Sequence, residues 1–198
     1  MEVRGDHSAV IIRLEKELPE IRSLPKNAFI SIIEGQGQLD DTSGRVDFSP
    51  CCMAFCKGLE IALFTVVFQR FRSEVSSLAS FDEMIIQAAS FEKANSITRF
   101  VSKGSPLELG TMAFTLNLCR GQTCEKMQLL SSLKGWILAH GFRELIEAVT
   151  ADQIADIAKR FRNPAAHAET FSREQATEAK RLCFLHLKHH LAAHSELN

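Results

Sequence analysis

A run of apolar residues between positions 50 and 75 constrains the fold of this chain more than any other feature. Ser49-Pro50 is a favourable helix start, and the side chains that follow leave no continuous polar face. The apolar residues of this run are Met53, Phe55, Leu59, Leu63, Phe64, Val67, Phe68 and Phe71. A helix without a polar face must be covered on all sides, which predicts the long central helix of a helical bundle. A buried strand over Ile61–Phe68 is the alternative, because the stretch is rich in β-branched and aromatic residues, but its helical flanks favour a helix.

The rest of the chain also has the apolar periodicity of helices rather than of strands, which predicts an all-α, up-and-down helical bundle. Helices are expected at about 8–18, 50–75, 81–102, 106–119, 122–140, 151–161 and 172–194, with a short one at 142–148. Thr150-x-x-Gln153 and Ser172-x-x-Gln175 have the pattern of capping boxes. We expect them to open the last two helices.

The N-terminal residues differ in pattern from the remainder of the chain. A first amphipathic helix is interrupted by Pro19, since proline removes a backbone donor and crowds the preceding turn. Over residues 33–49 the periodicity fades among glycines and aspartates, which is typical of a loop or linker. We therefore expect an N-terminal helix and a linker or extension over residues 1–48, followed by the helical domain over residues 49–198.

The composition is that of a soluble globular protein rather than of a protein that coats nucleic acid. The 198 residues are 45% hydrophobic and carry a formal net charge of −1, so any grip on RNA must come from a local patch. The most apolar run is bounded by Glu60 and Arg70, whereas a membrane span needs about 20 apolar residues, so none is expected. The charged N-terminus is unlike a signal peptide. These features predict a cytoplasmic protein whose six cysteines are free thiols.

The segment Arg162-Asn163-Pro164-Ala165-Ala166-His167 has the most informative chemistry, because it combines a guanidinium, an amide and an imidazole. Such groups can bind a phosphodiester and move its protons without a metal ion. Asn163 is a favourable N-cap and Pro164 is preferred at the first helical position, so one helix should end near Phe161 and another begin at once. His167 would then lie one turn into the new helix, near its positive dipole end, and the break would free it from helical phase with Arg162.

A second arginine and histidine with the same spacing, Arg181 and His186, lie inside a continuous predicted helix. Five residues along a straight helix rotate by roughly 140°, so these two side chains should point to different faces. The C-terminal histidines recur at helical spacing without a nearby carboxylate or cysteine partner, which favours solvent-facing side chains over a metal site. They are His186, His189, His190 and His194. No cofactor or metal is expected.

The motif at Arg162–His167, placed between two late helices, resembles the signature of the HEPN domain family: an arginine, a polar residue, a short variable stretch and a histidine. Cys56-Lys57-Gly58-Leu59-Glu60 at the start of the long apolar helix and Pro106-Leu107-Glu108-Leu109-Gly110 also resemble recurrent features of that family. The resemblance covers roughly residues 50–193. It implies a compact helical bundle that forms a two-fold homodimer. Many HEPN domains are metal-independent endoribonucleases with paired arginines and histidines in a cleft on the dimer axis, whereas others are binding or dimerisation modules.

If the resemblance extends to activity, each residue of the motif has a defined role in cleavage of RNA by its own 2′-hydroxyl. His167 would act as a proton donor or acceptor, since an unperturbed imidazole titrates near neutral pH. Arg162 would neutralise the non-bridging phosphate oxygens. Asn163 would hold the phosphate or orient the neighbouring pair. Because one histidine cannot readily serve as both base and acid, two-fold symmetry would supply the second.

The basic residues near the motif are candidates for RNA binding, namely Lys159, Arg160 and Arg173, although a charged face on a terminal helix is more often simply solvated. In HEPN toxins silenced by nucleotide addition, a tyrosine lies two residues after the histidine. Here that position is Glu169, which excludes this control but leaves a regulatory protein or bound nucleotide open. Two functions are therefore weighed: an endoribonuclease in stress response or phage defence, and a non-catalytic module that dimerises and binds a nucleotide or partner protein.

Overall fold

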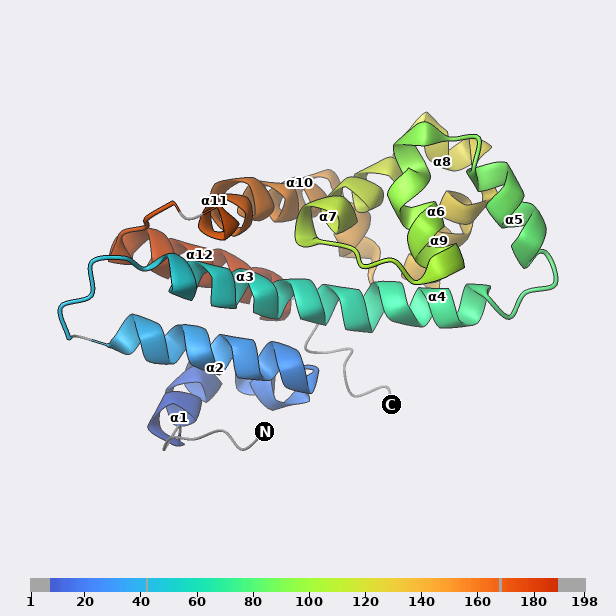
Figure 1. Cartoon of the computed structure of the whole chain (residues 1–198). Helices are drawn as coiled ribbons and strands as arrows, with labels where there is room; N and C mark the ends of the chain where they lie inside the picture. Colours follow the sequence, from blue (N-terminus) through green and yellow to red (C-terminus); the bar gives the residue numbers. More distant parts are fainter. Residues whose placement is uncertain (1–7, 42, 168, 189–198) are drawn as a thin grey trace. The chain divides into compact units, whose positions relative to one another are not determined.

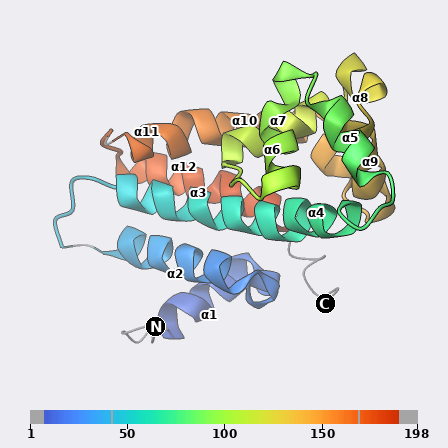
Figure 2. The ribbon, with the colours of Figure 1, turned by 45° about the vertical axis from the view of Figure 1, so that its right-hand side comes forward.

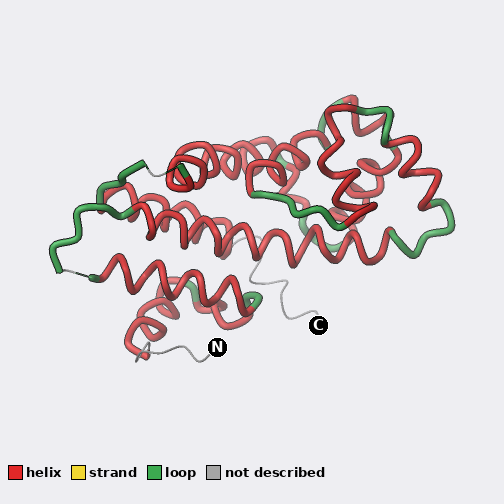
Figure 3. The backbone as a smooth tube through the Cα atoms, in the orientation of Figure 1, coloured by secondary structure: helices red, strands yellow, loops and turns green. Residues whose placement is uncertain are grey.

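The computed structural model describes residues 8–41, 43–167 and 169–188, and every regular element in these ranges is helical (Figures 1 and 3). The predicted all-α class is thereby confirmed. The stretch Ile61–Phe68 is helical throughout, so the alternative of a buried strand is wrong. The chain forms two compact units, which we call the first and the second unit. The first unit comprises Met1–Ala62 with Ile157–Asn198, and the second comprises Leu63–Asp156.

The first unit combines helices from both ends of the chain. Its elements are α1 (Ser8–Glu17), the 3-10 helix η1 (Pro19–Ser23), α2 (Lys26–Asp40), α3 (Ser49–Leu63), the π-helical turn η5 (Ala158–Arg162), α11 (Asn163–Ala166) and α12 (Arg173–His186). As predicted, α1 ends before Pro19. Leu14, on the apolar face of this amphipathic helix, is fully buried. The N-terminal helices thus belong to the same compact unit as the Arg162 motif, and the compact units divide elsewhere than after residue 48.

The segment predicted as a linker at residues 33–49 is helical as far as Asp40, which corrects the first half of the prediction, whereas residues 41 and 43–48 form a loop as predicted. Helix α2 continues through Gly35 and Gly37 to Asp40, and it runs alongside α3 in both ribbon views (Figures 1 and 2). A Cβ atom on Gly35 would lie 3.1 Å from the Cβ atom of Ala54 on α3. The glycine therefore allows close approach of two helices, and this packing outweighs the roughly 1 kcal/mol by which glycine disfavours a helix.

The packing of α3 on α12 explains why the chain's C-terminal helix belongs to the first unit. The rings of Phe55 and Phe184 meet edge to face with centroids 6.1 Å apart, a geometry that aromatic pairs prefer. The predicted capping box at the start of α12 is confirmed, because the Ser172 hydroxyl accepts from the Gln175 N–H and the Gln175 side chain accepts from the Ser172 N–H. The other predicted box is wrong: α10 (Ala148–Ile157) begins before Thr150, which lies inside the helix.

The second unit contains shorter helices than predicted. Its elements are the π-helical turn η2 (Phe64–Gln69), α4 (Arg70–Val75), α5 (Phe81–Ala88), η3 (Glu92–Ala94), α6 (Asn95–Lys103), α7 (Leu109–Leu118), α8 (Gln122–Lys126), α9 (Gln128–Ala139), η4 (Arg143–Ile146) and most of α10. The helices predicted over 81–102 and 122–140 are each interrupted, the second by Met127. Met127 has extended backbone angles and is fully buried, so a core contact replaces the continuation of the helix.

The long apolar helix predicted at residues 50–75 is confirmed, since α3, η2 and α4 form one continuous helix over Ser49–Val75. By length and composition it is sufficient to cross a membrane, which differs from the expectation based on the flanking Glu60 and Arg70. However, 67% of its most apolar window is buried inside the protein, as in the core helix of a soluble protein. The cytoplasmic location stays a prediction.

Candidate functional site

The Arg162–His167 motif lies on a helix that does not break, which corrects the local structure expected from the sequence. Arg162 ends the π-helical turn η5 and Asn163 begins α11, and both have right-handed helical angles, with φ of −66° and −71°. Asn163 is therefore not an N-cap, and no helix ends at Phe161. The position before a proline normally avoids helical angles, so the surrounding turn must hold Asn163 in this conformation.

The π-helical turn explains how the helix accommodates Pro164. A proline inside a regular α-helix lacks the N–H group and crowds the carbonyl four residues earlier, here that of Arg160. The wider π-helical turn over Ala158–Arg162 moves that carbonyl away from the ring. Single π-helical turns of this kind are frequent at functional sites, which is consistent with a special role for this segment.

His167 lies at the carboxyl end of α11 and not at its amino end as predicted. Its N–H group donates to the carbonyls of Asn163 at 3.1 Å and of Pro164 at 3.0 Å, which completes the last helical turn. Its side chain is exposed. The continuity of the helix places Asn163 and His167 four residues apart on one exposed face, while Arg162 is rotated roughly 140° from His167. The prediction that a helix break frees His167 from a fixed angular relation to Arg162 is therefore wrong.

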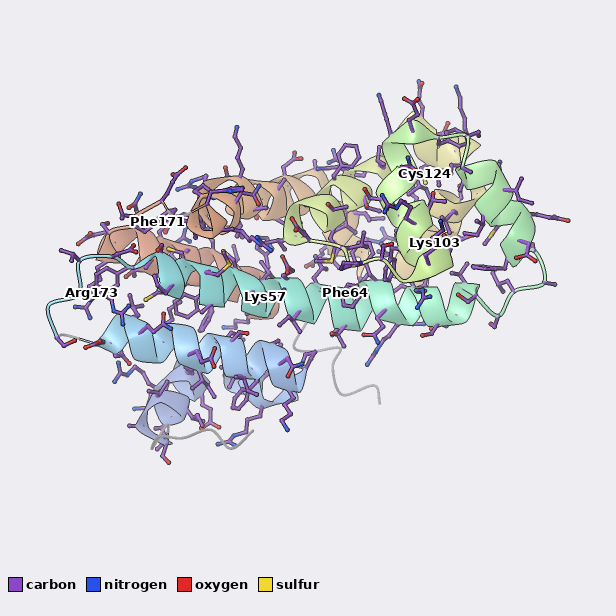
Figure 4. All side chains as sticks on the ribbon, viewed as in Figure 1. Lys57, Phe64, Lys103, Cys124, Phe171 and Arg173 are labelled. Carbon is purple, nitrogen blue, oxygen red and sulfur yellow. The ribbon has the colours of Figure 1, made fainter. Side chains whose placement is uncertain are left out.

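Arg162 is oriented by a buried carboxylate on α3. Its Nε donates to Glu60 Oε2 at 3.2 Å, and the Glu60 side chain is 6% exposed whereas that of Arg162 is 17% exposed. The other carboxylate oxygen, Oε1, accepts from Lys57 Nζ at 2.5 Å. Two cations thus share one carboxylate, and the cluster Lys57–Glu60–Arg162 has a formal charge of +1. Figure 4 shows Lys57 on α3.

The hydrogen bond to Glu60 uses only one of the donors of the arginine. A guanidinium has five N–H donors in a planar fork, of which Nε contributes one. Within the described ranges, no acceptor is hydrogen-bonded to either Nη atom of Arg162. Those two nitrogens form the edge that binds phosphate oxygens in a bidentate manner. The Glu60 contact therefore fixes the plane of the guanidinium without consuming the edge that would bind an anion.

In the sequence, Lys57 and Glu60 belong to a string that resembles a family feature, and nothing in that string indicates a role for either residue. Their spacing of three residues on one helix places both side chains on the same face, which could have indicated a local ion pair. The partnership of Glu60 with Arg162 spans 102 positions in sequence. No local pattern contains that information, because it depends on how α3 packs in the first unit.

The three predicted RNA-binding cations have different surroundings. Lys159 and Arg160 are exposed and line a surface groove of about 430 Å³ that also contains Glu174 and Glu178. The groove is therefore mixed in charge rather than basic. Arg173 instead donates from Nη2 to the Leu39 carbonyl at 2.7 Å, near the carboxyl end of α2, where an orphan helix carbonyl requires a donor. This contact gives Arg173 a structural role (Figure 4).

The remaining candidate ligands do not gather into a metal site. All six cysteines are free and buried, and the described part of the chain has no cluster of three or more His, Cys, Asp or Glu side chains suited to a metal ion. His186 is 1% exposed, so the prediction of a solvent-facing histidine is wrong there; it lies on the buried stripe of α12. The predictions for His189, His190 and His194 fall outside the described residues. Arg181 is exposed and paired with Glu178, which confirms that it and His186 face different ways.

Comparison with protein-family models, with curated proteins and with solved structures finds no match to this chain.

Proposed function

We propose that this protein is a metal-independent endoribonuclease of the HEPN type that cleaves RNA through its 2′-hydroxyl. The HEPN-like bundle and the two-fold homodimer are part of this proposal. The observation that carries it is the state of Arg162: a buried carboxylate accepts from its Nε, while no acceptor among the described residues is hydrogen-bonded to its Nη nitrogens. The exposed residue Asn163 begins α11, and the exposed residue His167 directly follows its last residue.

The separation of Arg162 from His167 supports a composite site. In one chain the two side chains point in directions roughly 140° apart, so a phosphate bound by Arg162 is not simultaneously aligned with His167 of that chain. A second copy related by a two-fold axis would bring its own His167 to the bound phosphate. Two histidines would then divide the proton transfers, one removing the 2′-hydroxyl proton and one protonating the leaving 5′-oxygen.

Lys57 adds the positive charge that the site requires. Glu60 alone would cancel the charge of Arg162 and weaken its attraction to a phosphodiester. With Lys57 bound to the same carboxylate, the cluster retains a formal charge of +1. The transition state of cleavage carries more negative charge on the phosphate oxygens than the ground state, so a preoriented cation lowers the barrier selectively.

The deciding experiment is cleavage of a labelled structured RNA in excess EDTA by the wild type and by the His167→Ala and Arg162→Ala variants. His167→Ala is the cleaner variant, because the side chain is exposed and its loss leaves the fold intact. The matched control is Arg181→Ala, an exposed arginine that is ion-paired outside the motif. We expect products with 2′,3′-cyclic phosphate ends from the wild type and the control, and none from the motif variants. Cleavage that survives both motif substitutions would refute the assignment.

The composite site makes a second, independent prediction about mixed dimers. If each active site needs both histidines, a one-to-one exchange of wild type with His167→Ala leaves only about a quarter of the activity, because only wild-type homodimers cleave. If each chain acts alone, about half remains. Light scattering establishes the oligomeric state, and a stable monomer with full cleavage activity would contradict the composite site.

The second candidate function is a non-catalytic module that dimerises and binds a nucleotide or partner protein. It is favoured by one observation: Arg162 is paired with a buried carboxylate, so it could serve the fold alone. A well-folded dimer that cleaves no RNA would favour this function over the nuclease.

A further inference from the structure

The mixed-charge groove beside the motif has features of a binding site. It lies within the first unit between the helix that carries the motif and α12. Arg160 and Lys159 line it two and three positions before Arg162, and Pro164 lines it two positions after. Among the described residues no acidic side chain is paired with Lys159, which remains exposed. The groove therefore shares Pro164 with the motif segment, and its two cations belong to the same π-helical turn as Arg162.

An aromatic and a planar cation provide a stacking surface in the groove. The guanidinium carbon of Arg160 lies 4.9 Å from the centroid of the Phe161 ring, and that ring is almost fully buried. The contact holds the Arg160 guanidinium in a preferred orientation over the ring. Nucleobases of single-stranded RNA stack on such guanidinium planes as well as on aromatic rings.

The opposite side of the groove is acidic, and its two carboxylates differ in availability. Glu178 accepts two hydrogen bonds from Arg181, at 2.7 Å and 2.9 Å, and is thereby occupied. Glu174 lies in the first turn of α12, where a hydrogen bond from the Ser172 hydroxyl lowers its pKa and keeps it ionised at neutral pH. Glu174 is exposed, and an ionised carboxylate that accepts one hydrogen bond can accept further donors from the groove.

A ligand for this groove must present negative charge on one side and hydrogen-bond donors on the other. A simple polyanion fails, because Glu174 would repel it. A nucleotide meets both needs, with its phosphate at Lys159 and its base edge at Glu174. Guanine fits best because its N1–H and N2–H donors are adjacent and match the two oxygens of a carboxylate. Uracil presents one N–H between two carbonyl oxygens, which a carboxylate disfavours.

We propose that this groove binds the nucleotide next to the scissile phosphate and selects guanine there through Glu174. The proposal rests on the proposed nuclease function. Its specific content is that the preference for guanine resides in one carboxylate, and that Lys159 contributes affinity without base preference.

The test maps cleavage sites in an RNA library with the wild type, with Glu174→Gln and with Lys159→Ala. A bidentate base contact discriminates between bases by about 1–3 kcal/mol. We therefore expect the wild type to cleave next to guanine at least about fivefold faster than next to other bases, and we expect Glu174→Gln to abolish this preference. Lys159→Ala should lower kcat/KM for all sequences equally. The matched control is Glu125→Gln, an exposed carboxylate on α8 in the second unit. Cleavage with an unchanged base preference in Glu174→Gln would overturn the subsite while leaving the nuclease standing.

Binding of guanosine and uridine monophosphates to His167→Ala protein, measured by calorimetry, separates the subsite from the nuclease. Tighter binding of the guanosine nucleotide that is lost in the His167→Ala, Glu174→Gln double variant supports the groove even if the wild type cleaves nothing. In that case the nuclease proposal fails and the groove remains a nucleotide site. Equal or absent binding of the two nucleotides overturns the groove proposal.

Discussion

The ion pair between Arg162 and Glu60 should contribute measurably to stability, and its size can be worked out from the structure. Removing one partner of a fully buried pair costs about 3–5 kcal/mol, since the other charge is left without compensation. Here the Arg162 side chain is 17% exposed, and Glu60 has a second cation, because Lys57 Nζ lies 2.5 Å from Glu60 Oε1. We therefore expect Arg162→Ala to lower the free energy of unfolding by about 2 kcal/mol, which for this chain length lowers Tm by about 4–8 °C.

A double-mutant cycle in urea denaturation followed by circular dichroism measures this contribution. In a Glu60→Gln background the buried charge is gone, so Arg162→Ala should cost only about 0.5 kcal/mol. The coupling free energy between the two positions is then about 1.5 kcal/mol. The control Arg181→Ala removes a pair whose side chains are 62% and 37% exposed, and it should leave the free energy of unfolding nearly unchanged.

Equal costs of Arg162→Ala in the two backgrounds would refute the reasoning, because they would show that Glu60 does not hold Arg162. The cycle also bears on function. If the Arg162→Ala variant is partly unfolded, a loss of cleavage can come from the missing guanidinium or from the missing fold. The nuclease assay must therefore be run well below the Tm of the variant. His167→Ala needs no such precaution, since its side chain is exposed.

Three further predictions concern the fold and the thiols. Gly58→Ala should destabilise the first unit by about 1–2 kcal/mol, because the added Cβ atom would lie 2.6 Å from Ile32 Cγ1. A Cβ atom at Gly37 would have no other atom within 4 Å, so Gly37→Ala should stabilise α2 by about 0.5–1 kcal/mol. Urea denaturation measures both changes. Ser172→Ala should cost about 1 kcal/mol through loss of the capping box, and no change in Tm would contradict that role. Cys124 should be the first cysteine alkylated by iodoacetamide at pH 7, because a hydrogen bond with the neighbouring thiol lowers its pKa to about 6. Its advantage should vanish as the pH falls below about 6 and the thiolate is protonated; peptide mass spectrometry follows the order of labelling.

The sequence was sufficient for the elements whose cause is local. The helix over Ser49–Val75 follows from an apolar run too long for a strand, and the start of α12 follows from a serine and a glutamine three residues apart that cap each other. Interrupted helices were missed where a buried side chain stops the helix, as at Met127, because such a break reflects a tertiary contact. A tertiary contact also explains why α2 extends into the segment predicted as a linker, because its Gly35 allows close packing on α3.

The candidate site shows the same division between features that local sequence determines and features that tertiary packing determines. From the sequence alone came the residue types that suit phosphodiester chemistry and their spacing at Arg162, Asn163 and His167. Only the tertiary structure decided their directions, because the π-helical turn lets the helix continue through Pro164 instead of breaking there. The partnership of Arg162 with Glu60 was likewise decided by packing. Local sequence specifies chemistry and backbone preference, whereas the burial that holds a charge in one orientation arises only when distant helices meet.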